Sequence, residues 1–294
     1  MAGILDTVKD LGRLRQIVQV LIAHGFGEVV QRTGLGGLVP GKAKQATHKD
    51  DTAKRIRLAI TDLGPSFVKL GQILSTRPDL IPANIIAELK TLQDQVPPVP
   101  FAQIEHQIQA ELGAPIATIF ASFDPEPLAS ASIGQVHRAT FQAPDGVHEV
   151  VVKVQRPNIK ETIERDIELL YWLAKAIERS IPESRTYQPV RLVEEFDRAI
   201  TAELDFTLEA ENAVKFGKNF EGNVDVRFPR IYRTASAKRV LTLEFFDGHK
   251  IYGAIEEGYS AERICKNTLG FIIKAVFEDG FFHADPHPGN VLIL

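Results

Sequence analysis

The most informative stretch of the chain lies near its end and reads His283-Ala-Asp285-Pro-His287-Pro-Gly-Asn290. It follows a predicted helix over residues 260–279 and precedes the apolar run Val291–Leu294. Two imidazoles, a carboxylate and a carboxamide are groups that transfer protons or bind metal ions. The stretch therefore predicts a chemical site placed between a helix and a strand.

Two functional interpretations fit this stretch. The catalytic loop of kinases reads H-R-D-x-x-x-x-N, and Asp285 and Asn290 have that spacing, with His283 at the position of the kinase histidine. Alternatively, His283, Asp285 and His287 bind zinc or iron in a metal-dependent hydrolase, because Pro286 and Pro288 favour an extended backbone. A purely structural loop is the third reading, and the kinase spacing is the one we favour.

Four upstream segments are considered together with this stretch. Residues Ala129–Val136 have the spacing of the kinase phosphate loop G-x-G-x-x-G-x-V, with two glycines replaced by alanine, and Lys153 follows on the predicted strand Val150–Gln155. Kinases hold this lysine with a helical glutamate, for which the acidic group Glu203, Asp205 and Glu209 offers candidates. On one continuous helix, Asp205 and Glu209 would share a face and Glu203 would lie about 120° from Glu209, so one helix could serve two partners. The segment Phe67–Gln72, taken alone, predicts a helix with a surface lysine.

Composition bounds the protein class. The 294 residues are 44% hydrophobic and 24% charged, which is typical of a globular protein of one or two domains. The net charge of −4 argues against a generic nucleic-acid partner. The single cysteine, Cys265, excludes a disulfide framework and a zinc site built from cysteines. We find no secretory or transit signal and no apolar run of the roughly 18 residues that a membrane span needs.

Periodicity and breakers predict the order of elements. An amphipathic basic helix over 4–30 either docks on the rest of the protein, which we favour, or lies on an anionic membrane. A loop over 34–44 separates it from helices over 50–93, with breaks at Gly64-Pro65 and near 78–82. The remaining elements are a helix over Phe101–Leu112, strands near 119–130, 133–143 and 147–155, helices near 159–180 and 189–218, and strands near 226–232 and 238–246.

The order of five segments resembles the UbiB/AarF family of atypical kinase-like proteins, from about residue 50 onward. These segments are KLGQ (69–72), ASASIGQVH (129–137), VVVKVQRP (150–157), ELDFTLEAEN (203–212) and HADPHPGN (283–290). The resemblance implies an α+β, protein-kinase-like fold. It also implies a helical extension over 1–115 that carries the K-x-G-Q motif, a complete N-lobe over 116–246 and the start of a C-lobe over 247–294.

The resemblance implies a nucleotide site for ATP or ADP with Mg²⁺. In it, Lys153 would contact the phosphates, Glu209 would be its partner, Asp285 would be the catalytic acid–base residue and Asn290 a magnesium ligand. The other implied nucleotide contacts are Ala129, Ser130, Ala131, Ser132, Ile133, Gly134, Val136 and Glu244. Residues of the extension, Lys69, Gly71 and Gln72, would lie over the site, with Lys69 paired to Glu203 or Asp205, and so discourage protein phosphorylation.

The resemblance further implies an ATPase that supports synthesis of ubiquinone or a related prenyl-quinone lipid. We expect a protein of the bacterial cytoplasm that is peripherally associated with the inner membrane. Its expected partners are membrane lipids or quinone precursors and quinone-biosynthesis proteins, and a homodimer is one arrangement. A nucleotide-gated scaffold without turnover is the alternative. Because the sequence stops four residues after Asn290, before a D-F-G aspartate, we expect an inactive fragment.

Overall fold

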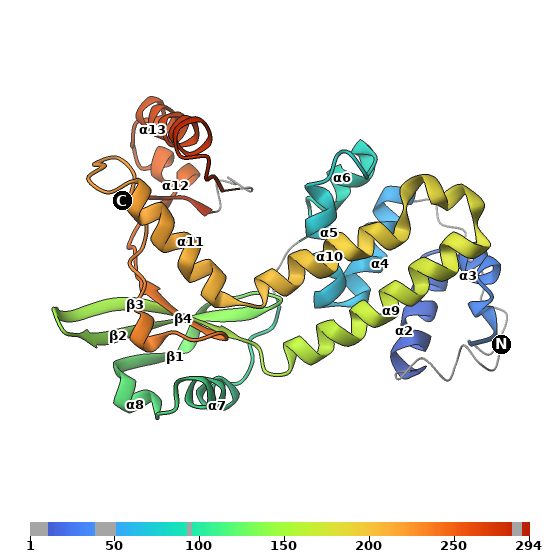
Figure 1. The fold of residues 1–294 in the computed structure, drawn as a ribbon, viewed down its shortest axis with the longest axis horizontal. Coiled ribbons are helices and arrows are strands. Elements are labelled where there is room, and N and C mark those ends of the chain that lie inside the picture. Colours follow the sequence, from blue (N-terminus) through green and yellow to red (C-terminus); the bar gives the residue numbers. More distant parts are fainter. Residues whose placement is uncertain (1–10, 39–50, 93–95, 284–289) are drawn as a thin grey trace. The chain divides into compact units, whose positions relative to one another are not determined.

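The computed structural model describes residues 11–38, 51–92, 96–283 and 290–294, and its contacts divide the chain into two compact units (Figure 1). The first unit comprises Met1–Val99, Ala129–Gln135 and Gln155–Leu204. The second comprises Pro100–Leu128, Val136–Val154 and Asp205–Leu294. Helices make up the first unit and a sheet with helices makes up the second, so the predicted α+β class is confirmed. The predicted domain boundaries at 115/116 and 246/247 stay predictions.

The first unit is built from helices of the N-terminal half and two long helices of the middle of the chain. They are α2 (Leu11–Ala23), α3 (Gly27–Arg32), η1 (Leu35–Leu38), α4 (Thr52–Leu63), α5 (Pro65–Ser75), α6 (Ala83–Leu89), α9 (Ile159–Ser180), η2 (Pro182–Tyr187) and α10 (Pro189–Glu203). The predicted break at Gly64-Pro65 is confirmed, because Gly64 has φ 95° and Pro65 is the first residue of α5.

The first amphipathic segment is docked on its own chain, as the favoured interpretation predicts. Helix α2 buries Leu14, Ile17 and Val18 in a core that includes residues of α5 and α9. The Arg13 guanidinium donates hydrogen bonds to the buried Asp166 carboxylate of α9 at 2.8 and 3.1 Å. The predicted helix over 4–30 is interrupted between α2 and α3, where Gly25 has φ 81°. Its first residues, and most of the predicted loop over 34–44, lie outside the described residues.

The second unit contains the sheet and the remaining helices. Its elements are α7 (Phe101–Leu112), α8 (Ile116–Ile119), β1 (Phe120–Ser130), β2 (Gly134–Ala143), β3 (Gly146–Gln155), α11 (Phe206–Asn219), η3 (Arg233–Ala235), β4 (Val240–Glu244), β5 (His249–Lys250), α12 (Ile251–Glu256), α13 (Ala261–Ile273), the π-helix η4 (Lys274–Glu278) and β6 (Leu292–Ile293). The tips of β1, β2 and β3 belong to the first unit by their contacts. The three predicted strands between 119 and 155 are confirmed to within one residue at each end.

The four-stranded sheet has the order β1-β2-β3-β4, with α11 on one side and α7 and α8 on the other (Figure 1). Strands β3 and β4 are antiparallel, and Lys153 lies opposite Leu241. Along β3, Val150, Val152 and Val154 are fully buried, which is the alternation expected of a strand with two different faces. Lys153, between two of these valines, therefore points to the opposite face, toward α11.

Three predicted elements are wrong in extent. Residues 226–232 form no continuous strand, and only Ile231 bridges Leu243, because Pro229 has no amide hydrogen to offer to a neighbouring strand. The predicted strand over 238–246 is shortened to β4. The helix predicted over 260–279 is regular only in α13 and continues as the π-helix η4. Among the described residues, no helix combines the length and the apolar character required to cross a membrane.

Candidate functional site

Lys153 and Glu209 form an ion pair between β3 and α11. The Lys153 ammonium donates to the Glu209 carboxylate over 2.6 Å, and it also lies 4.6 Å from the centre of the Phe206 ring. Phe206 is the first residue of α11 and is buried together with Ala210 and Leu241, so it fixes the start of this helix against β4. Both charged side chains remain partly exposed, at 33% and 48%. A cation is therefore presented at the surface of the unit, where an anionic ligand can reach it.

The acidic segment around Glu203 is not one helix, and this prediction is wrong. Helix α10 ends at Glu203, and α11 begins at Phe206. Asp205 is the N-cap of α11 and accepts a hydrogen bond from the Thr207 amide at 3.0 Å. The Gln155 side chain donates a hydrogen bond to the Leu204 carbonyl at 2.6 Å. Leu204 lies at the junction of the two helices, so this hydrogen bond supports the break between them. Glu203 and Glu209 therefore serve different partners from two separate helices.

The Asp205 carboxylate is occupied by local contacts. The Thr207 hydroxyl donates to it over 2.5 Å, and Lys238 forms an ion pair with it at 3.2 Å. These two contacts, the hydroxyl first, lower the pKa of Asp205 below its ordinary value. Asp205, one of the two partners predicted for Lys69, is therefore paired with Lys238 instead. Sequence reasoning missed Lys238 and Phe206, although an Asp just before an apolar residue is a signal for a helix start.

The K-x-G-Q motif lies on α5 in the first unit. The Lys69 ammonium is 2.8 Å from the Glu203 carboxylate at the end of α10, which is the first of the two predicted pairings. Gly71 is buried where α5 meets its neighbours: an added Cβ would lie 2.4 Å from the Leu92 side chain and 3.3 Å from that of Ile60. Gln72 is half-buried on the same helix. Packing therefore explains the glycine of the motif, because α5 lies too close to its surroundings for a larger side chain at this position.

The alanine-rich loop connects β1 to β2 in a tight hairpin. Its closing hydrogen bond runs from the Ala131 amide to the Gly134 carbonyl at 2.8 Å. Ser132 and Ile133 are 1% and 8% exposed, and Ile133 belongs to a core cluster with α9 and α10. Of the predicted phosphate-contacting residues, Ala129 is exposed and Ser130, Ala131 and Val136 are half-buried. Accessible surface for a ligand is therefore concentrated in the first half of the loop.

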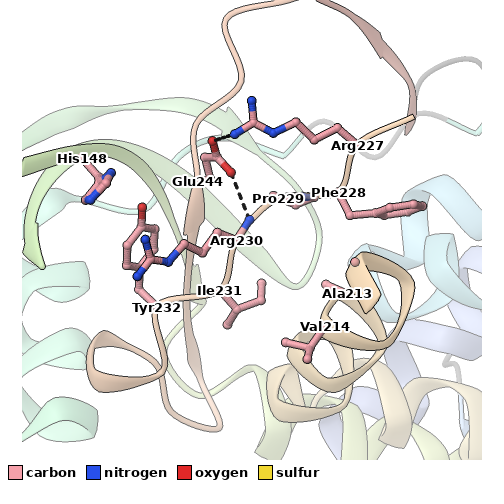
Figure 2. A pocket seen from close by; sticks show the side chains of 11 residues that line it. His148, Ala213, Val214, Arg227, Phe228, Pro229, Arg230, Ile231, Tyr232 and Glu244 are labelled. Carbon is pink, nitrogen blue, oxygen red and sulfur yellow. Dashed lines mark hydrogen bonds and ion pairs between the residues drawn. The ribbon is translucent and has the colours of Figure 1, made fainter. Parts of the chain in front are cut away.

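Glu244, at the end of β4, lines a pocket of about 590 Å³ in the second unit (Figure 2). Its carboxylate forms an ion pair with Arg227 and accepts a hydrogen bond from the Arg230 amide at 3.2 Å. The Arg230 side chain is paired with Asp145, and this contact lowers the pKa of Asp145 to about 2. Small residues of α11, Ala213, Val214 and Gly217, form the opposite wall. The predicted contact between Glu244 and a nucleotide stays a prediction. In the structure, the Glu244 carboxylate is paired with Arg227.

The segment leading to the HADPHPGN stretch is anchored on α11. The Phe281 ring lies 4.6 Å from that of Phe216, and the Lys215 ammonium lies 3.9 Å from the centre of the Phe281 ring. His283 is exposed, and Asn290 is exposed two residues before β6. Strand β6 pairs with β5, so the apolar run after Asn290 has a partner in the second unit. Helix α11, which carries Glu209, therefore also contacts the residues that lead into this stretch.

Asp285 and His287 lie outside the described residues, so the predicted catalytic aspartate and the alternative metal cluster stay predictions. Within residues 11–38, 51–92, 96–283 and 290–294, no group of three or more His, Cys, Asp or Glu side chains could hold a metal ion. Asn290 supplies a carboxamide oxygen, a ligand type that suits Mg²⁺. The described side chains are thus chemically suited to bind phosphate at Lys153 and to coordinate Mg²⁺ through Asn290.

Comparison with known proteins gives consistent matches. Residues 91–294 match the model of a family described as the ABC1 atypical kinase-like domain. Among curated proteins, one named "Probable protein kinase UbiB" from Aliivibrio fischeri is 36% identical over 302 residues, which cover 98% of this chain and 54% of that protein. Another of that name, from Marinobacter nauticus, is 43% identical over 242 residues, covering 81% of this chain and 44% of that protein.

A solved structure is also similar. It is described as the complex of Rv3197 with erythromycin from Mycobacterium tuberculosis, with a TM-score of 0.54 and 28% sequence identity. The match covers 76% of this chain and 56% of that one. The chain spans about half the length of the curated relatives that it matches.

Proposed function

The chain belongs to the family of ABC1 atypical kinase-like domains, and on this premise we propose that it binds ATP or ADP with Mg²⁺ at Lys153. The observation that carries the proposal is the 2.6 Å contact between Lys153 and Glu209. In kinases, a strand lysine held by a helical glutamate contacts the nucleotide phosphates. An ammonium that is already oriented loses less side-chain freedom when phosphate oxygens bind, and charge-assisted hydrogen bonds of this kind are among the stronger ones.

The loop between β1 and β2 is proposed to cover the phosphates, and Asn290 is proposed as a magnesium ligand. A magnesium ion held there would supply positive charge that offsets the negative charge of the phosphates. Asp285 is the proposed acid–base residue, with the spacing to Asn290 that the kinase catalytic loop has. The family favours this nucleotide chemistry over a metal-dependent hydrolase built on His283, Asp285 and His287.

The K-x-G-Q helix is proposed to regulate the site. Lys69 and Glu203 form an ion pair within the first unit, with side chains 20% and 39% exposed. A paired cation on α5 is fixed in position and would discourage a peptide substrate if this helix lies over the nucleotide. The double variant Lys69→Glu with Glu203→Lys exchanges the two charges and keeps an ion pair. It should restore the regulation of the site that either single substitution disturbs.

For the whole protein we propose support of ubiquinone or related prenyl-quinone synthesis at a bacterial membrane. The proposal rests on the UbiB name of the curated relatives, of whose length the chain spans about half. Membrane lipids or quinone precursors and quinone-biosynthesis proteins are the proposed partners, and peripheral association with the inner membrane is the proposed location. Because the described part of the chain shows no spanning helix, any attachment through that part would use its surface.

The proposal is tested by nucleotide titration of the chain with and without Mg²⁺. We expect saturable binding that Lys153→Met weakens by at least about tenfold, as loss of a charge-assisted hydrogen bond predicts. Lys160→Met is the matched control, since Lys160 is an exposed lysine of α9 with only a 3.7 Å pairing to Glu164. Equal affinities of the parent and Lys153→Met would overturn the proposal.

A further inference from the structure

We propose that Arg156 is a positioning residue of the nucleotide site, because it connects the alanine-rich loop to the Val96–Val99 segment and so controls how fast nucleotide leaves. This inference rests on the proposed function, since it takes the loop as the cover of the phosphates. Arg156 follows β3 directly and lies three residues after Lys153. One short stretch therefore supplies both the cation for the phosphates and the connection that holds their cover.

The Arg156 guanidinium is engaged on two sides. Toward the loop, Nε donates to the Ala131 carbonyl at 2.7 Å, and Nη2 donates to the Ser130 hydroxyl at 2.7 Å. Toward the preceding segment, Nη2 donates to the carbonyls of Pro97 at 2.9 Å and Val96 at 3.3 Å. A planar guanidinium with donors in a fixed fork can satisfy several acceptors at once, which a lysine ammonium on a flexible stem does less well.

Two further contacts connect the same pair of segments. The Val96 amide donates to the Ser130 carbonyl at 3.3 Å. The fully buried Gln135 accepts from the Val99 amide at 2.9 Å and donates to the Val99 carbonyl at 3.4 Å. Buried amide groups with both partners satisfied are costly to separate. The loop is thus bonded at its start by Arg156 and at its end by Gln135 to one and the same segment.

The backbone of the loop adds to this restraint. The Arg156 amide donates to the Ile133 carbonyl at 2.8 Å, so Arg156 contacts the loop through its main chain as well as its side chain. Alanine at 129 and 131 also allows fewer backbone conformations than the glycines of a kinase phosphate loop. Opening this loop would require the Arg156 side-chain bonds to break. Arg156 therefore sets the mobility of the loop, while Lys153 sets the attraction for phosphate.

The experiment compares Arg156→Met, which removes all side-chain donors at similar length, with Arg156→Lys and with Arg179→Met. Arg179 is an exposed arginine at the end of α9, so its variant makes the same charge change away from the loop. The first readout is hydrogen exchange of the Val96 and Val99 amides and of residues 129–136 without nucleotide. The second is the dissociation rate of a fluorescent ADP analogue in the presence of Mg²⁺.

We expect Arg156→Met to speed exchange in both segments, and nucleotide dissociation, by on the order of tenfold each. Arg156→Lys should lie between Arg156→Met and the parent, and Arg179→Met should match the parent. Ser130→Ala, which removes one acceptor, should act in the same direction more weakly and should add little to Arg156→Met. It provides the test if Arg156→Met fails to fold.

Each other outcome overturns a defined part of the inference. Unchanged exchange of the loop in Arg156→Met, or in Ser130→Ala if that variant is needed, overturns the connection itself. Faster exchange with an unchanged dissociation rate overturns its effect on nucleotide. Absence of nucleotide binding by the parent chain contradicts the proposed function and the dissociation effect, whereas the exchange result still decides whether Arg156 restrains the loop.

Discussion

The Lys153 ammonium lies 2.6 Å from the Glu209 carboxylate, although 56 positions separate the two residues along the chain. Lys153 comes from the face of β3 opposite its buried valines, and Glu209 comes from the first turn of α11. The pair is partly exposed, so water screens it and its contribution to stability is below about 1 kcal/mol. Its importance is therefore expected in ligand binding more than in folding.

Glu209→Gln should separate these two effects. The variant keeps the shape of the side chain but removes the charge that orients Lys153, so nucleotide affinity should fall while the melting temperature shifts by no more than about 4 °C. Titration with Mg²⁺-ADP and thermal unfolding measure the two quantities. Glu211→Gln, an exposed change on the same helix, is the control. Full nucleotide affinity in Glu209→Gln would contradict the orienting effect.

Gly248→Ala should weaken the pairing of β5 with β6. An added Cβ would lie 2.9 Å from the Ile293 carbonyl oxygen and 2.8 Å from the Leu294 side chain, and the backbone oxygen cannot move without disturbing the strand. We expect a loss of about 1–3 kcal/mol in the free energy of unfolding, measured with urea. Gly253→Ala in α12 meets open space and should instead stabilise by about 0.5–1 kcal/mol. Equal stabilities of the two variants would show that the close contact is absent.

His137 should make stability depend on pH. Burial lowers the pKa of His137 below 6.5, and its Nδ1 donates to the Asp124 carbonyl at 2.9 Å beside the rings of Phe101 and Phe123. The unfolded chain therefore binds a proton more readily than the folded chain, so stability is full above pH 6.5 and falls as the pH drops toward the folded pKa.

His137→Phe keeps an aromatic ring and removes the titration. Melting temperatures between pH 7.5 and about pH 5 should therefore fall less steeply in this variant than in the parent. His106→Gln replaces an exposed histidine of α7 and should leave the parent's slope intact. The same slope in His137→Phe as in the parent would assign the pH dependence to other groups.

The apolar face of the helix near the C-terminal end of the sequence should promote self-association. Leu269, Ile273 and Phe277 are 56%, 46% and 81% exposed, whereas Ile272 is half-buried. Contiguous exposed apolar groups favour contact between proteins. Light scattering should show an apparent mass that rises with concentration and falls in the double variant Leu269→Glu with Phe277→Glu. Val224→Glu, at a 95% exposed position, is the control, and a parent that stays monomeric throughout would contradict the prediction.

Much of the fold could be predicted because local signals agreed with tertiary packing. Gly64-Pro65 separates α4 from α5, and Gly113 ends α7 in the left-handed conformation with φ 72°. The kinase-like fold and the resemblance to the UbiB family are confirmed by the matching family and its relatives. The break at Leu204 was missed because neither glycine nor proline marks it. It is made by the Asp205 cap and by a hydrogen bond from Gln155, a residue 49 positions away.

The candidate site was predictable in its residue types and less so in its contacts. Motif spacing identified Lys153, and the family resemblance implied Glu209 as its partner; the contact between the two side chains agrees with that pairing. Periodicity could not show that Ser132 and Ile133 face a core, because the loop is too short to have a period. Nor could it identify Arg156, whose acceptors are the Ser130 hydroxyl and three backbone carbonyls brought together by the fold. Such contacts depend on tertiary structure alone.

The most direct test of a phosphate site at Lys153 is labelling with an acyl-phosphate derivative of ATP, which transfers its acyl group to a lysine amine beside the bound phosphates. Mass spectrometry of the digested chain then identifies the modified lysine. We predict acylation of Lys153 that excess ATP with Mg²⁺ suppresses, while labelling of exposed lysines such as Lys160 does not respond to ATP. A chain in which Lys153 escapes acylation, or is acylated equally with and without competing ATP, would contradict the account.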